Sequence, residues 1–132
     1  MFKPKKFQAH EAWIAFKLND APMTTEANGD FNVLTLMDAA SCFILGSECI
    51  RAVSSEPSQA ESRRLLMEGQ SRSLQHLPKK LFIPAEQAAD ILCAEAERLS
   101  ITVIRAPEEE LSLFIREARE GFQKHVGGGS FH

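Results

Sequence analysis

Apolar runs separated by turn-forming residues fill the first 54 positions, and three of these runs have the character of β-strands. They cover residues 12–18, 32–37 and 42–50 and are rich in aromatic and β-branched side chains. Asn28-Gly29-Asp30 favours a hairpin turn, because Asn and Gly accept positive φ. Each run is apolar at successive positions, a pattern typical of strands that are covered on both faces. We therefore expect three antiparallel strands in a sheet with two buried faces.

The period of the apolar positions changes after Ser54. Spacings of three and four predict helices over 57–75, 86–99 and 107–126, and short apolar runs predict strands at 80–83 and 101–104. Gly69 weakens the first of these helices by about 1 kcal/mol relative to alanine. The last helix has the clearest pattern, an apolar stripe that must pack on a neighbouring element. That stripe consists of Leu111, Phe114, Ile115, Ala118, Phe122 and Val126.

The order of these elements indicates an α/β fold. A three-strand antiparallel meander is followed by helix, strand, helix, strand and helix, so the last two strands should be parallel to one another. The sequence predicts a mixed sheet with helices on both faces. We expect a single domain over residues 1–132, with a core at about 12–126 and loose tails at 1–10 and 127–132.

Composition is that of a globular, cytoplasmic protein. Of the 132 residues, 44% are hydrophobic and 25% are charged, which argues against disorder. No apolar run approaches the ~20 residues of a membrane span, and the first residues lack the apolar stretch of a secretory signal. The three cysteines form no C-x-x-C pair, so we expect reduced thiols that act as small buried apolar groups.

Basic residues gather in two places, although the net charge of −3 gives no overall attraction to nucleic acid. One cluster is Lys3, Lys5 and Lys6, and the other lies in the first helix and the segment that follows it. Glutamates at 56, 61 and 68 share that second region and favour an ordinary solvated helix face. We expect nucleic-acid binding to be weak. The candidate phosphate contacts are Arg63, Arg64, Lys79 and Lys80, with Arg72 in the same cluster.

Isolated acids and histidines give no site of their own. Asp38 precedes Ser41 in a predicted turn, and we interpret its carboxylate as the acceptor of a backbone N–H there. Glu86 and the glutamates at 108–110 stand where helices are expected to begin, so helix capping explains them. The four histidines are far apart in the sequence, with no pair at helical spacing, and they predict no metal site.

The order of elements resembles the ribonuclease H-like fold of retroviral-type integrase and transposase cores. The local match is best at residues 36–46 (LMDAASCFILG), where an apolar strand meets an Asp-x-x-Ser turn and a second apolar run ends in Gly. Trp13 in the first strand fits the same pattern. Residues 81–107 are similar to small bacterial domains of this superfamily, in which an apolar strand is followed by Pro-Glu and a final helix.

The resemblance implies a two-metal site whose carboxylates come from the first strand, from just after the fourth strand and from the last helix. The first of these positions, three residues after Trp13, holds Phe16, which cannot bind a cation. Asp20 is four residues further on, about 13 Å at strand rise, and is too distant to replace it.

Three hypotheses for the function follow. The first is a non-catalytic binding or assembly module of ribonuclease H-like fold that associates with a protein partner or with itself, without a cofactor. The second is a Mg²⁺- or Mn²⁺-dependent nuclease with displaced carboxylates, which would be Asp20, Asp38 and Glu86. The third is a weak nucleic-acid-binding module.

Overall fold

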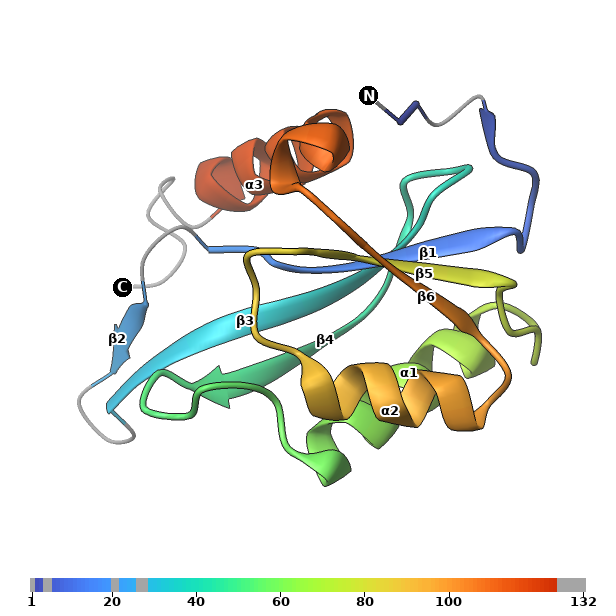
Figure 1. Cartoon of the computed structure of the whole chain (residues 1–132). Helices are drawn as coiled ribbons and strands as arrows, with labels where there is room; N and C mark the ends of the chain where they lie inside the picture. The colour runs from blue at the N-terminus through green and yellow to red at the C-terminus, as the bar shows by residue number, and fades with distance from the viewer. Residues whose placement is uncertain (1, 4–5, 20–21, 26–28, 126–132) are drawn as a thin grey trace.

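A computed structural model describes residues 2–3, 6–19, 22–25 and 29–125 of the chain (Figure 1). Six strands and three α-helices occur within these ranges, and a short 3₁₀-helix, η2, leads into the last helix. The elements are β1 (Ala12–Lys17), β2 (Met23–Thr25), β3 (Gly29–Asp38), β4 (Ile44–Arg51), α1 (Gln59–Arg72), β5 (Lys80–Pro84), α2 (Asp90–Arg98), β6 (Thr102–Ala106), η2 (Glu108–Leu111) and α3 (Ser112–His125).

The six strands form one mixed sheet, as the order of elements predicts. β3 is antiparallel to β1 on one edge and to β4 on the other, and β1, β5 and β6 are parallel to one another. Phe31 pairs with Met23 of β2 and with Arg51 of β4, so β2 lies on the same edge of β3 as β1. The resulting order across the sheet is β4, β3, β1, β5 and β6. β2 occupies the same edge of β3 as β1.

Helices cover both faces of this sheet (Figure 1). Trp13 and Ala15 of β1 face a core that includes Leu65 and Leu66 of α1 and residues of α2. Ile14 and Phe16 point to the opposite face, where α3 supplies Phe114 and Ile115. Every residue from 12 to 16 is fully buried, which explains why this strand is apolar at successive positions.

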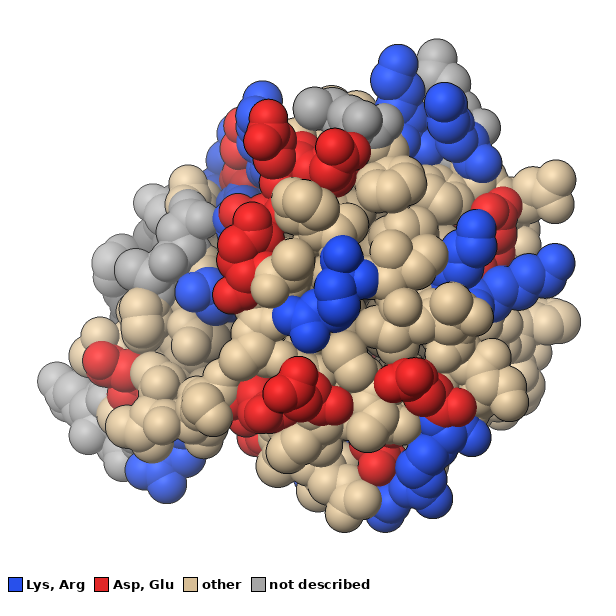
Figure 2. All heavy atoms as spheres, in the orientation of Figure 1, with Lys and Arg blue, Asp and Glu red and all other residues tan. Residues whose placement is uncertain are grey.

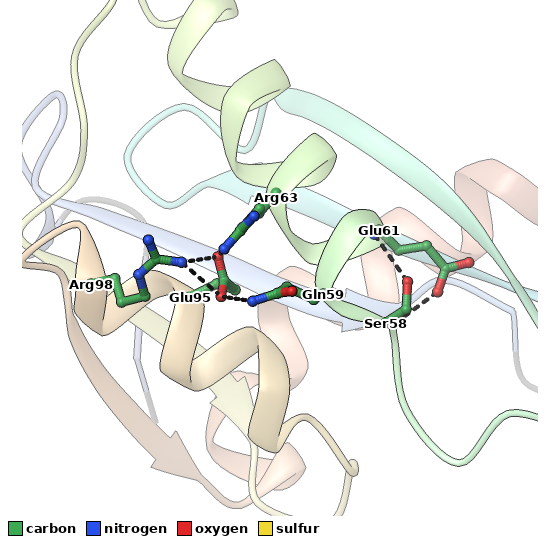
Figure 3. Close-up of polar contacts among 6 residues, drawn as sticks. All are labelled: Ser58, Gln59, Glu61, Arg63, Glu95 and Arg98. Carbon is green, nitrogen blue, oxygen red and sulfur yellow. Dashed lines mark hydrogen bonds and ion pairs between the residues drawn. The ribbon is translucent and has the colours of Figure 1, made fainter.

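Helix α1 begins with a capping box and lies very close to the sheet. Ser58 Oγ accepts the Glu61 N–H at 3.1 Å, and the Glu61 carboxylate accepts the Ser58 N–H at 2.8 Å (Figure 3). Gly69 gives the reason for the close approach. A Cβ there would lie 2.5 Å from Leu36 Cδ2 and 3.0 Å from the Trp13 ring. The glycine that weakens the isolated helix is therefore what allows the helix to pack.

Glu95 joins α1 to α2. Its carboxylate accepts hydrogen bonds from Arg63 Nε at 2.6 Å, from Gln59 Nε2 at 3.1 Å and from Arg98 at 3.2 Å (Figure 3). The residue is 7% exposed, so these donors compensate the loss of water around the charge. The hydrogen bond from Arg63, with those from Gln59 and Arg98, holds the pKa of Glu95 below its usual range.

One strand was not predicted, and one predicted helix boundary is wrong. β2 was not expected; it forms a hairpin with the start of β3, where Gly29 has the positive φ of 73° that the turn motif predicts. Asn28 of that motif lies outside the described residues. Helix α2 begins at Asp90, four residues later than predicted. The guanidinium of Arg105 donates to the carbonyls of Pro84, Ala85 and Gln87. These three oxygens thus accept side-chain hydrogen bonds in place of the backbone hydrogen bonds of a helix.

The described part of the amino-terminal segment is not a loose tail, which corrects the expectation for residues 1–10. The Phe2 ring lies 4.8 Å from the Phe82 ring, and the Phe2 N–H donates to Glu110 O at 3.0 Å. Phe7 contacts Phe82 and Phe114, with ring centroids 5.7 and 6.2 Å away. The segment therefore completes the core beneath α3. Residues 127–132 and Val126 lie outside the described ranges.

Within the described residues, no helix is both long enough and apolar enough to span a membrane.

We predict opposite effects of alanine at two helical glycines. Gly69→Ala should lower the free energy of unfolding by about 1 to 2 kcal/mol, because the clash with buried Leu36 and Trp13 outweighs the gain in helix propensity. Gly121→Ala, on α3 with no atom within 4 Å of its Cβ, should raise it by about 0.5 kcal/mol. Urea unfolding measures both. A stabilised Gly69→Ala variant would contradict the packing described for α1.

We also predict that Glu95 makes stability depend on pH. A carboxyl group whose pKa is lower in the folded than in the unfolded chain contributes its full stabilisation at pH values above the pKa of the unfolded chain, about 4.3. That contribution is lost as the pH falls through the pKa of the folded chain. Glu95→Gln should therefore unfold at lower urea than the parent at pH 7, with a smaller difference at pH 3. Glu97→Gln, at an exposed position on the same helix, is the matched control and should leave urea unfolding unchanged at both pH values. An equal deficit at both pH values would exclude an ionic contribution.

Candidate functional site

A cleft opens where β1 and β5 diverge at their carboxyl ends. The two parallel strands pair only from Ala12 with Lys80 to Ile14 with Phe82. Past this point β1 keeps its partner β3 on the other edge, through Lys17 and Leu34. The carboxyl ends of adjacent parallel strands that separate are the usual place for ligands in α/β sheets. This geometry makes the cleft the first candidate for a functional site.

Side chains replace the missing strand partner at the end of β1. The Lys17 N–H donates to Gln87 Oε1 at 3.0 Å. The Lys17 carbonyl accepts from Arg119 Nε at 3.1 Å and from its terminal nitrogen at 2.8 Å. Both backbone groups of Lys17 are thus satisfied, as buried backbone requires. Residues from the β5–α2 loop and from α3 are fixed at one point of β1.

Two glutamates complete this connection. Glu86 Oε1 accepts the Glu108 N–H at 2.9 Å, and Glu108 Oε1 accepts from Arg119 at 3.2 Å. Glu86 therefore caps the start of η2, and the prediction that it caps its own helix is wrong. The Arg119 side chain is only 17% exposed, so its cation belongs to the wall of the cleft and not to the outer surface.

The cavity has a volume of about 330 Å³ and a mixed polar and apolar wall. Leu34, Ile50 and two prolines supply apolar surface, and the β4–α1 loop supplies Ser54 and Ser55. Glu56 also lines the cavity, but its Oε1 accepts the Ile91 N–H at 2.7 Å. Most polar groups of the wall are already bonded to other parts of the chain, an arrangement suited to holding a ligand rather than to proton transfer.

Two of the three carboxylates of the nuclease hypothesis, Asp38 and Glu86, do not meet. Asp38 pairs with Trp13, which is level with Leu81, whereas Glu86 follows Leu81 by five residues. Because β5 continues to Pro84, the two acids are separated by at least about 10 Å along the sheet, too far to share a metal. Asp20 lies outside the described residues. Across residues 2–3, 6–19, 22–25 and 29–125, no three His, Cys, Asp or Glu side chains form a group able to hold a metal ion.

Asp38 has the structural role that the sequence predicts. Its Oδ2 accepts the Ser41 N–H at 3.0 Å and the Ser41 hydroxyl at 2.7 Å. The carboxylate therefore closes the turn between β3 and β4.

The predicted phosphate contacts are divided between two places. Arg63 is bound to Glu95, and Arg64 donates two hydrogen bonds of 2.6 and 2.8 Å to Glu48. The hydrogen bond to Glu48 raises the pKa of Arg64. Both arginines are thus occupied by acids of the chain itself. Lys79 and Lys80 stand apart, at the start of β5 and at the opposite end of the sheet from the cleft.

The cysteines provide no activated nucleophile among the described groups. Burial raises the pKa of Cys42, and Glu117 and Asp38 raise it further. Burial also raises the pKa of Cys93, against a smaller lowering by Arg105. Protonated thiols are poor nucleophiles. Cys49 is exposed on β4, which corrects the expectation that all three are buried.

Sequence reasoning missed the three residues that build the cleft: Lys17, Gln87 and Arg119. Lys17 ends β1, Gln87 lies in the β5–α2 loop and Arg119 lies within α3. Polar residues at such positions are commonly ordinary surface side chains. The signal that was available is the place of Gln87 directly after Glu86, which the nuclease hypothesis names as a candidate ligand.

Comparison with known proteins adds no family or relative. No protein-family model matches the sequence, and no curated protein matches it.

Proposed function

We propose that this chain is a non-catalytic domain of ribonuclease H-like fold that acts by binding at the cleft between β1 and β5. The mixed sheet, the meander followed by α-β-α-β-α and the helices on both faces agree with that fold. The end of β1, the residues after β5 and the last helix meet at this cleft, where Arg119 and Glu86 join them through Glu108. The resemblance assigns metal carboxylates to the residues after the fourth strand and to the last helix, and a third to the first strand at the position of Phe16.

The groups at these places do not fit a pair of divalent metals. Phe16 is fully buried among the aromatic rings beneath α3 and offers no oxygen. Glu86 is committed to the Glu108 N–H. Two divalent ions in one site need several carboxylates facing the same point. The residues of this cleft provide three glutamates that are bonded to the chain, Glu56, Glu86 and Glu108, and two cationic side chains, Lys17 and Arg119.

The guanidinium of Arg119 is the observation that carries the proposal. It lies against the carbonyl at the end of β1 and beside Glu108, in the region where the fold would place metal ligands. A fixed cation in this position repels a divalent ion and neutralises the acid that would hold it. Binding of a ligand is then the function that we propose for the cleft. The ligand that we propose is a protein partner or a second copy of the chain.

We predict that the purified protein cuts no nucleic acid. Single- and double-stranded DNA, RNA and hybrids should remain intact above background with Mg²⁺ or Mn²⁺. Titration with Mn²⁺ followed by NMR should leave the amide signals of Gln87 and Glu108 as sharp as that of Ser41, at the other end of the sheet. Cutting that disappears in Glu86→Ala, or selective broadening of Gln87 and Glu108, would favour the nuclease hypothesis and overturn the proposal.

A further inference from the structure

The sheet also has a positively charged end, opposite the cleft. Two segments far apart in the sequence meet where β1 and β5 begin. The N–H groups of Lys79 and Lys80 donate to Glu11 O at 3.0 and 3.1 Å, and the His10 and His76 rings are stacked with centroids 4.3 Å apart. We call residues 2–3, 6–11 and 74–80 together the amino-end surface. It unites part of each of the two basic clusters that the sequence keeps separate.

Four lysines of this surface have ammonium groups without an acid partner in the described part of the chain. Lys3 and Lys6 are exposed and flank Phe2 and Phe7, whose rings pack on Phe82. Lys79 and Lys80 are also exposed, and Lys80 precedes Phe82 by two residues on the same strand. The four lysines therefore lie on the two segments that supply Phe2, Phe7 and Phe82 to one aromatic cluster. Figure 2 shows positive side chains gathered along this margin of the molecule.

Acids are scarce on the amino-end surface. Glu11 is the one acid among its described residues, and its carboxylate accepts the Gln8 N–H at 3.0 Å. Other acids lie on α3, and η2 borders this surface where the Phe2 N–H donates to Glu110 O at 3.0 Å. The net charge of −3 thus hides a local excess of positive charge, and the arginines of α1 are not needed to make it.

We propose that the amino-end surface binds single-stranded nucleic acid. The lysines supply contacts to phosphates. His10 and His76 are both exposed, and their imidazole rings are stacked. An unpaired base can extend this stack on a ring face. A surface that offers aromatic rings beside lysines matches a single strand better than a duplex, whose bases are already stacked. The binding is independent of the cleft and of the function proposed for it.

Fluorescence anisotropy with a labelled single strand of about twelve nucleotides tests the proposal. With four lysines engaged, the logarithmic salt slope should be about −2.8, so affinity should fall about 50-fold between roughly 50 and 200 mM salt. Lys79→Ala with Lys80→Ala should reduce this fall to about sevenfold. Arg51→Ala with Lys124→Ala changes the net charge equally at exposed sites outside the amino-end surface and is the matched control. It should leave both affinity and slope unchanged.

His76→Ala tests the stacking contact. It should weaken binding about tenfold with no change in the salt slope, because it removes a ring and not a phosphate contact. Thermal melts of all variants, compared with the parent, separate loss of binding from loss of folding. Absence of binding near 50 mM salt, or equal effects of the lysine pair and the control pair, would overturn the proposal. So would binding to phosphatidylglycerol vesicles without binding to the oligonucleotide, which would assign the surface to membranes.

Discussion

The central strand must have every backbone hydrogen-bonding group satisfied, and much of the structure follows from how this is done. β1 is buried on both faces, so its amides and carbonyls have no access to water. β3 binds one edge along its length, but β5 binds the other only as far as Ile14. At Lys17 the side chains of Gln87 and Arg119 take the place of a strand. This substitution ties the β5–α2 loop and α3 to β1 and leaves the cleft between them.

The same requirement explains the position of neighbouring elements. Arg105 on β6 binds three carbonyls of the segment 84–87, which keeps that segment out of helix α2 and places Glu86 and Gln87 at the cleft. On the opposite face of the sheet, Gly69 allows α1 to approach Trp13 closely. Glu95 then fixes α2 to α1. Arginine side chains thus hold together parts of the fold where strand pairing and apolar packing end.

Charge is distributed between the two ends of the sheet in different ways. At the carboxyl end, Arg119 is bonded to Glu108, and Glu86 accepts a backbone N–H. At the amino end, four lysines stand with one acid among the described residues. Formal net charge cannot distinguish these arrangements, because it sums paired and unpaired groups alike. The two proposals for binding rest on this difference.

The sequence by itself determined the α/β class, the parallel pair β5 and β6, the buried character of β1 and the Asp38 turn. These depend on local patterns: successive apolar residues, helical spacing and a short carboxylate beside a serine. The tertiary structure decided the start of α2, the packing of Phe2 and Phe7, and the composition of both surfaces. Arg119 reaches Lys17 across 102 positions, and His10 meets His76 across 66, so neither contact leaves a periodic trace in the sequence. Arg63 and Lys79 look alike in a basic cluster, but the first is bound to a buried glutamate and the second is exposed to solvent. Only the path of the chain determines which charges find partners, because ion pairing depends on distance in space and not along the sequence.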